Sequence, residues 1–129
     1  MKLAEVPSKD MKVELEFLYP KESSYIKGFI DLVFRIDGRY YLLDWKTNYL
    51  GPTENDYSEE SMKTCMNHHQ YFLQASIYAN ALEKYLALYD ARPFSKIFGG
   101  AIYFFLRQTQ AYIFQPKPGA FACLNSPQG

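Results

Sequence analysis

The feature that most constrains this chain is the dipeptide Asp37-Gly38, which separates two apolar runs rich in β-branched and aromatic residues. A type I′ turn requires positive φ at both of its central residues, so Asp-Gly between two such runs is a strong signal for a tight β-hairpin. We therefore expect one strand over about residues 25–36 and a second over about residues 39–47. Because a two-residue turn fixes the register, the sequence also predicts which side chains face each other across the hairpin.

This register brings two acidic side chains together. With Ile36 opposite Arg39, counting away from the turn puts Asp31 opposite Asp44 in a non-hydrogen-bonded pair, where side chains come closest. The Cβ atoms of opposed residues lie about 4.5–5.5 Å apart, so two carboxylates there repel each other unless a proton or a cation lies between them. Lys46 follows Asp44 by two residues and therefore points to the same face. Since Mg²⁺ is typically held by one or two carboxylates plus water and substrate phosphate, this face predicts a metal site.

The charged face also has a simpler interpretation, as an exposed surface with solvated side chains. Its apolar neighbours Phe29, Val33 and Leu42 argue against this interpretation, because the solvated face of a hairpin is usually polar throughout. We expect the hydrophobic core on the opposite face of the hairpin, lined by Ile30, Leu32, Phe34, Ile36, Leu43 and Trp45.

The rest of the chain predicts a mixed sheet with helices on its faces. Alternating apolar and polar residues indicate a strand before the hairpin, and a nearly continuous apolar run indicates a later strand buried on both faces. The segment between the hairpin and that later strand has helical periodicity, so the two strands it joins should be parallel. We expect strands over residues 12–19, 97–107 and 111–115, a loop over 49–57, a helix that starts near Asp56 or Ser58 and breaks around 67–69, and a second helix over about 70–89.

Length and composition limit the class of protein. With 129 residues, of which 48% are hydrophobic and 18% aromatic, the chain is expected to form one globular domain. It has two cysteines, no apolar run of membrane-spanning length and no signal peptide, so we expect a cytoplasmic protein without membrane association. Lys plus Arg and Asp plus Glu both number 14, and this balance counts against a domain that binds nucleic acid on its own.

Two residues of the second predicted helix extend the candidate site. Gln74 and Tyr78 stand four residues apart, so they lie on one side of the helix beside its apolar stripe. One interpretation is a surface pair or a buried hydrogen bond. The other is a pair that reaches over the sheet towards Lys46 or a phosphate, and the sequence leaves both open.

A cluster of cysteine and histidine residues precedes this pair. Cys65, His68 and His69 invite a zinc interpretation, but a structural zinc site needs four ligands and Cys123 is the only plausible addition. We therefore expect ordinary helix residues here. A stacking platform for bases is conceivable from the many tyrosines, but strand and helix periodicities favour a packing role for Tyr40, Tyr41, Tyr71 and Tyr85.

Together these residues resemble the motifs of the PD-(D/E)XK nuclease superfamily, and most closely those of its RecB branch. Residues 28–51 are similar to motifs II and III of that branch, and residues 74–78 are similar to its Q-x-x-x-Y motif. A D-x-K tripeptide alone is a weak signal, whereas D-x₁₂-D-x-K with Q-x-x-x-Y 28 residues after the lysine is specific. The resemblance covers about residues 25–107 and implies a restriction-endonuclease-like α/β fold, with a mixed β-sheet of about five strands and flanking helices.

The resemblance also implies a role for each residue of the candidate site. Asp31 and Asp44 would ligate Mg²⁺ together with the main-chain carbonyl of Trp45. Lys46 would orient or deprotonate the attacking water and stabilise charge on the phosphate. The residues that would position the lysine or the DNA backbone are Gln74 and Tyr78.

This sequence departs from the family pattern at one point. The family places a histidine metal ligand on a helix well upstream of the first aspartate, whereas only 30 residues precede Asp31 here. Neither His68 nor His69 stands in the expected position. We therefore expect residues 1–129 to form a single nuclease domain without its helical start, as the C-terminal fragment of a larger helicase–nuclease chain.

The implied function is Mg²⁺-dependent hydrolysis of phosphodiester bonds in DNA. The chain would be the nuclease domain of a RecB-type helicase–nuclease of the exodeoxyribonuclease V type, acting in double-strand break repair and recombination. Its expected partners are DNA and RecC- and RecD-like subunits. One alternative is a catalytically silent DNA-binding or subunit-docking module of the same fold, and another is a nuclease of the related phage exonuclease branch.

Overall fold

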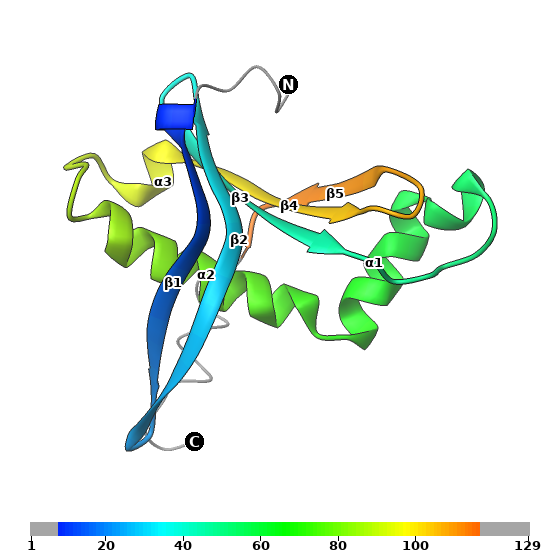
Figure 1. The fold of residues 1–129 in the computed structure, drawn as a ribbon, viewed down its shortest axis with the longest axis horizontal. Helices are drawn as coiled ribbons and strands as arrows, with labels where there is room; N and C mark the ends of the chain where they lie inside the picture. Colours follow the sequence, from blue (N-terminus) through cyan, green and yellow to red (C-terminus); the bar gives the residue numbers. More distant parts are fainter. Residues whose placement is uncertain (1–7, 117–129) are drawn as a thin grey trace.

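A computed structural model describes residues 8–116 of the chain, and Figure 1 shows their arrangement. These residues form one five-stranded sheet with helices on it. In chain order the elements are η2 (Ser8–Asp10), β1 (Met11–Lys21), β2 (Ser24–Ile36), β3 (Arg39–Lys46), η3 (Glu54–Tyr57), α1 (Glu59–His68), α2 (Tyr71–Leu86), α3 (Phe94–Ile97), β4 (Phe98–Phe105) and β5 (Gln110–Phe114).

The sheet is mixed, as predicted. Its strands follow one another in the order β1-β2-β3-β4-β5, and only β3 and β4, which the helical crossover joins, are parallel. The hairpin between β2 and β3 has the predicted register, since Ile36 pairs with Arg39. Asp37 and Gly38 have φ values of 51° and 77°, the positive values that a type I′ turn requires. The fold predicted from the sequence is therefore confirmed.

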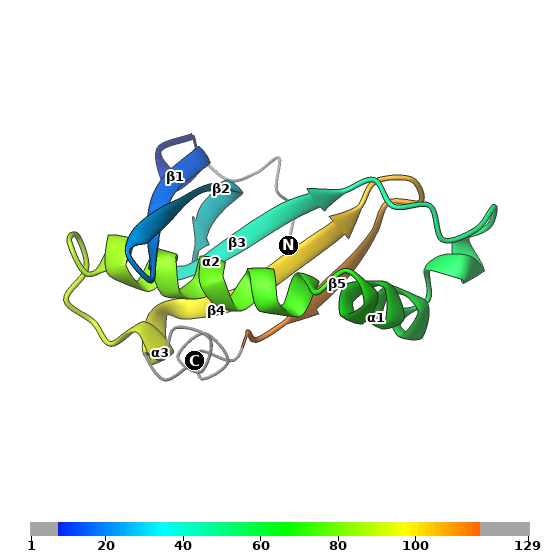
Figure 2. The ribbon, with the colours of Figure 1, turned by 90° about the horizontal axis from the view of Figure 1, so that it is seen from below.

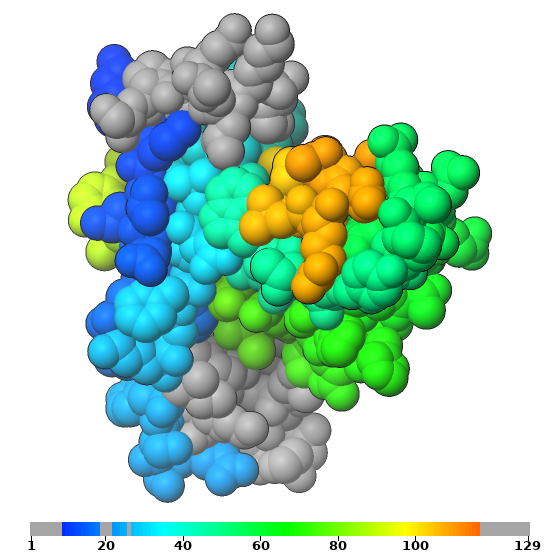
Figure 3. All heavy atoms as spheres, turned by 45° about the vertical axis from the view of Figure 1, so that its right-hand side comes forward, coloured from blue at the N-terminus to red at the C-terminus, as the bar shows by residue number. Residues whose placement is uncertain are grey.

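The sheet divides where the hairpin ladder ends. Pairing between β2 and β3 stops at Leu32–Leu43, so the predicted ladder pair between Asp31 and Asp44 does not form. Beyond that point β2 continues beside β1, while β3 continues beside β4 (Figure 1). One arm consists of β1 and β2, and the other consists of the end of β3 with β4 and β5. Figure 3 shows both arms as spheres from another side, with β1 and β2 in blue and cyan and β5 in orange beside α1 in green. The two aspartates thus lie at the fork between the arms.

The helices decide which face of the sheet holds the main core. Helix α2 lies along one face (Figure 2), and its buried residues pack with Val33 and Leu42, on the same side of the sheet as Asp44. The prediction that the core lies on the opposite face is therefore wrong. Leu32, Phe34 and Leu43 form a second, smaller cluster on that face with Ile102, joined at its edge by Ile36.

Two residues of the predicted core depart from it for separate reasons. Trp45 is 40% exposed, because it lies at the margin of the smaller cluster, where its ring packs edge-on against Phe104. Ile30 is buried in the main core together with Val33, although residues three apart on a regular strand point to opposite faces. The alternation of β2 therefore changes at Asp31, where the hairpin ladder also ends.

The break between the two main helices falls close to its predicted place. Helix α1 begins after Ser58, whose side chain accepts a hydrogen bond from the backbone N–H of Ser61 at 3.2 Å, as an N-cap residue does. Gln70, between α1 and α2, has a φ of 57°, which ends the first helix and turns the chain into the second. Helix α2 ends at Leu86, three residues earlier than predicted, because the exposed Leu88 and Tyr89 have no core to pack on.

Gly28 gives a test of how the β1–β2 arm supports α2. A Cβ atom built on Gly28 would lie 2.5 Å from Cζ of Phe17, whose ring packs edge-on against the ring of Tyr78 at 5.6 Å. Gly28→Ala is expected to lower the free energy of unfolding by about 1–3 kcal/mol, because the Phe17 ring must leave its place in the packing. Chemical denaturation measures this loss. The double variant Gly28→Ala/Phe17→Leu should lose less free energy of unfolding than the two single variants lose together. Losses that add in full would contradict the proposed clash.

Candidate active site

The fork of the sheet fixes the side chain of Asp31. In a continued hairpin the backbone N–H of Trp45 would donate to a carbonyl of β2. Here it donates instead to Oδ2 of Asp31, at 3.0 Å. The carboxylate therefore takes the place of a ladder acceptor, so the end of the ladder leaves this N–H paired and holds Asp31 beside the last residues of β3.

Asp44 and Lys46 form a nearly buried ion pair on β3. Oδ2 of Asp44 and Nζ of Lys46 are 2.6 Å apart, and the two side chains are only 6% and 12% exposed. Burial raises the pKa of Asp44 from 3.8 to about 6; the neighbouring Lys46 lowers it, and the nearby Asp31 carboxylate raises it further. The structure thus brings the two predicted acids and the predicted amine into one cluster, in which the negative charges outnumber the positive one.

Gln74 connects this cluster to helix α2. Its Oε1 accepts hydrogen bonds from Nζ of Lys46 at 3.2 Å and from the hydroxyl of Tyr103 at 2.7 Å. Its Nε2 donates to the hydroxyl of Tyr78 at 2.9 Å. Both polar ends of the amide are therefore used. The structure contains features of both interpretations that the sequence left open, because Gln74 and Tyr78 share a partly buried hydrogen bond and Gln74 also reaches Lys46.

Two further tyrosines belong to the cluster, although the sequence analysis did not include them. The ring centroids of Tyr71 and Tyr103 lie 3.8 and 5.3 Å from Nζ of Lys46. Tyr71 stands three residues before Gln74 on the same helix, a spacing that places both on one face and that would have identified it. Tyr103 is the partner of Asp44 in the parallel β3–β4 pairing, which only the tertiary structure reveals.

Burial also acts on the tyrosines around the amide. The pKa values of Tyr78 and Tyr103 are both raised, first because the hydroxyls are buried and then because the charge on Asp44 opposes a phenolate. Both hydroxyls therefore remain protonated and keep their hydrogen bonds to Gln74.

The candidate zinc residues are not arranged as a metal site in the part of the chain that the structure describes. Cys65 is buried on α1, and the rings of His68 and His69 pack edge-on at 5.0 Å. Within residues 8–116 no group of three or more histidine, cysteine, aspartate or glutamate side chains is placed to hold a metal ion. Cys123 lies outside the described residues.

The donor set at the fork fits a hard divalent cation. Each carboxylate of Asp31 and Asp44 has two oxygens with about four lone-pair sites, so the contacts to Trp45 and Lys46 leave further lone pairs available. Mg²⁺ typically takes one or two carboxylates and completes its octahedron with water and substrate phosphate. Two acids without a third are therefore sufficient for this type of site.

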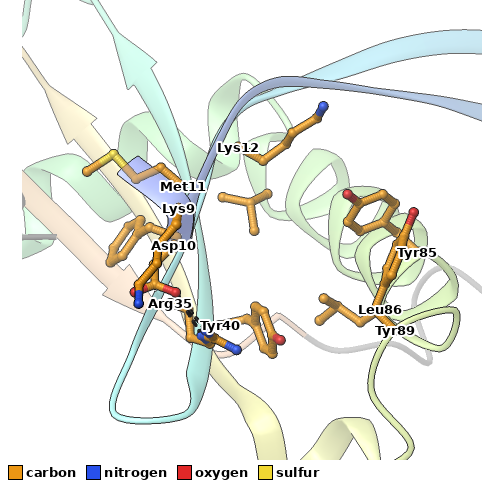
Figure 4. Close-up of a pocket in the computed structure, with 11 residues that line it drawn as sticks. Lys9, Asp10, Met11, Lys12, Arg35, Tyr40, Tyr85, Leu86 and Tyr89 are labelled. Atoms are coloured by element: carbon orange, nitrogen blue, oxygen red, sulfur yellow. Dashed lines mark hydrogen bonds and ion pairs between the residues drawn. The ribbon is translucent and has the colours of Figure 1, made fainter. Parts of the chain in front are cut away.

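A separate cleft lies at the other end of the hairpin (Figure 4). It has a volume of about 240 Å³ and contains none of the predicted site residues. Arg35 and Asp10 form an ion pair of 2.7 Å on one side of the cleft, and Tyr85 lies on the other.

The four tyrosines that the sequence predicts to serve packing all contact a hydrophobic cluster. Three of them contact the main core, Tyr40, Tyr71 and Tyr85, and Tyr41 contacts the smaller cluster.

With this fold and these residues in place, comparison with known proteins identifies the class. The chain belongs to the PD-(D/E)XK nuclease superfamily, whose family model matches residues 2–125. Members of this superfamily typically use divalent metal ions. The resemblance inferred from the motifs is thereby confirmed.

Among individual proteins, the chain is similar to RecB subunits of the RecBCD enzyme. It is 42% identical to RecB of Escherichia coli over 122 residues, which is 86% of this chain and 10% of that protein. It is also 42% identical to RecB of Haemophilus influenzae over 97 residues, and 41% identical to RecB of Mycobacterium tuberculosis over 86 residues, in each case 8% of the relative. The chain thus spans about a tenth of the length of these relatives. No helix within residues 8–116 is long and apolar enough to cross a membrane.

The raised pKa of Asp44 predicts how the stability of the metal-free protein depends on pH. The folded state binds this proton more tightly than the unfolded state, so the contribution is most favourable below pH 3.8 and is lost as the pH rises past about 6. A shift of this size corresponds to about 3 kcal/mol. Asp44→Asn should therefore raise the free energy of unfolding relative to the parent at about pH 7.5, by about 2 kcal/mol more than at about pH 4.5, where part of the cost is already present.

Denaturation in metal-free buffer at the two pH values measures this difference. Asp37→Asn, which removes one negative charge from the exposed hairpin turn and keeps a residue that tolerates positive φ, is the matched control. A gain for Asp44→Asn that is equal at both pH values would contradict the assigned cause.

Proposed function

We propose that this chain hydrolyses phosphodiester bonds in DNA with the help of Mg²⁺. The observation that supports this most directly is the cluster at the fork of the sheet, in which Asp31, Asp44, Lys46 and Gln74 form one connected group. Burying an ion pair beside a second carboxylate in this way does not favour stability, as the raised pKa of Asp44 indicates. Ionisable groups whose surroundings shift their pKa at the expense of stability are common in active sites.

The two aspartates and the main-chain carbonyl of Trp45 are the proposed metal ligands. Bound there, Mg²⁺ supplies Lewis-acid polarisation of the phosphate and a water of lowered pKa. The contribution of the protein is the fixed position of the carboxylates, since the hydrogen bond from Trp45 to Asp31 ties one of them to the strand that carries the other.

Lys46 is the proposed electrostatic and water-orienting group. Its ammonium lies beside the carboxylates and is held from the helix side by the amide oxygen of Gln74. An ammonium in a largely water-excluded position stabilises negative charge on a phosphate far better than one in bulk water, because the surroundings screen it less.

Gln74 and Tyr78 are proposed to position this lysine. The amide of Gln74 has its nitrogen paired with the Tyr78 hydroxyl, so its oxygen is directed to the ammonium and to Tyr103. Rotation of the amide would place donors against donors, which makes this orientation of the side chain the favoured one.

We further propose that the chain is the nuclease domain of a larger RecB-type helicase–nuclease of the exodeoxyribonuclease V type, in the cytoplasm. The similarity to RecB of E. coli over 86% of the chain supports this proposal. Its partners would then be DNA and RecC- and RecD-like subunits, and its role would be double-strand break repair and recombination. The formal net charge of zero suits a domain to which other domains deliver the DNA strand.

A catalytically silent docking or DNA-binding module of the same fold is the second candidate. Such a module has no need of a nearly buried acid–amine pair with a second acid beside it, so the geometry favours the nuclease. Absence of Mg²⁺-dependent cleavage by the intact protein would favour the silent module.

Substitution of Asp44 and Lys46 tests the proposal. In the intact enzyme, Asp44→Ala and Lys46→Ala are each expected to lower cleavage of linear and single-stranded DNA with Mg²⁺ by at least about 100-fold, because each removes a charge that acts on the reacting phosphate. Hydrolysis of ATP should remain. Lys84→Ala, an exposed lysine in the last turn of α2, is the control and should cleave normally. Unchanged cleavage by Asp44→Ala would end the metal-site proposal.

A further inference from the structure

The ammonium of Lys46 lies against an aromatic ring that none of the proposed roles uses. The distance from Nζ of Lys46 to the ring centroid of Tyr71 is 3.8 Å, well within the range of about 6 Å over which a cation and a ring attract each other. The side chain of Lys46 is only 12% exposed, so little water competes with this contact. Under these conditions the ring is a substantial attraction and not an incidental neighbour.

The ring of Tyr71 is itself held by three neighbours. Its hydroxyl donates to Oδ1 of Asn48 at 3.2 Å. The imidazole of His69 stacks on it with a centroid distance of 5.2 Å and an interplanar angle of 19°, and the ring of Tyr103 lies 5.8 Å away. The position of the ring is therefore determined independently of Lys46.

Local structure explains how this ring reaches the end of β3. Tyr71 is the first residue of α2 and directly follows Gln70, whose positive φ turns the chain between the two helices. Asn48 follows Lys46 by two residues, so its hydrogen bond to Tyr71 ties the end of the strand to the start of the helix. The same two elements meet again through Gln74.

We propose that Tyr71 is a positioning residue that holds the ammonium of Lys46 at the site through a cation–π contact. This inference rests on the proposed nuclease function. Asp44 and the oxygen of Gln74 each accept from the ammonium, which has three N–H groups. The ring face attracts the ammonium without offering a lone pair. It therefore restrains the lysine while an N–H remains for a phosphate or a water.

A graded series of rings at position 71 tests the electrostatic part of the proposal. Phenylalanine and its mono-, di- and trifluorinated forms keep the shape of the ring while fluorine withdraws charge from its face. In the intact enzyme, Tyr71→Phe should retain kcat within about threefold, kcat should fall stepwise with each fluorine, and Tyr71→Leu should lower it about 10- to 30-fold. KM for DNA should change less than about twofold throughout, since the ring acts through Lys46 and not on the substrate.

Tyr49→Leu is the matched control. Tyr49 lies three residues after Lys46 and is 63% exposed, and its ring contacts Arg107 and not the ammonium of Lys46. It should leave kcat unchanged. A kcat that does not respond to fluorination, or a fall of equal size for Tyr71→Phe and Tyr71→Leu, would overturn the proposal.

A second measurement is independent of cleavage. Protons above the face of an aromatic ring are shifted upfield, so the ε-methylene protons of Lys46 should resonate upfield of those of exposed lysines in the NMR spectrum of the 129-residue chain. This shift should persist in Tyr71→Phe and fall in Tyr71→Leu to the smaller value that the more distant ring of Tyr103 produces, and an unchanged shift in Tyr71→Leu would overturn the proposal. If Lys46→Ala cleaves normally while the shift behaves as expected, the proposed function fails and the ring contact does not.

Discussion

The candidate site depends on one interaction, the hydrogen bond from the backbone N–H of Trp45 to the carboxylate of Asp31. At this point the hairpin ladder has ended and β2 diverges from β3. A carboxylate in the place of a carbonyl keeps the strand end paired, so the fork does not leave a donor without a partner. The same bond fixes one acid beside another.

The charged groups at the fork act on one another at short range. Burial raises the pKa of Asp44, the ion pair with Lys46 works against this effect, and Asp31 adds to it. The rings and amide around Lys46 restrain a long side chain that would otherwise have several rotamers. Without a cation, holding these charged groups close together lowers the free energy of unfolding. Such a loss of stability is typical of an active site.

Much of this site could be predicted from the residues, and the missing parts share a cause. The Asp37-Gly38 turn fixes the hairpin register locally, and the helical spacing of Gln74 and Tyr78 fixes their common side. The main core was placed on the wrong face because both faces of β2 and β3 carry apolar residues. Alternation identifies a strand, but it cannot say which of two apolar faces a helix will cover.

The sequence by itself determined the elements, the turn and the identity of the acids, the amine and the amide, since each of these follows from spacing along one strand or one helix. The tertiary structure alone decided the end of the hairpin ladder, the exchange of faces at Asp31 and the contact of Tyr103 with Lys46. These features arise where β3 parts from β2 while its other edge stays paired with β4, a strand more than fifty residues away in the chain. The physical reason is that the course of β3 depends on its pairing with the distant strand β4 and on packing against α2, and no local pattern contains either of these.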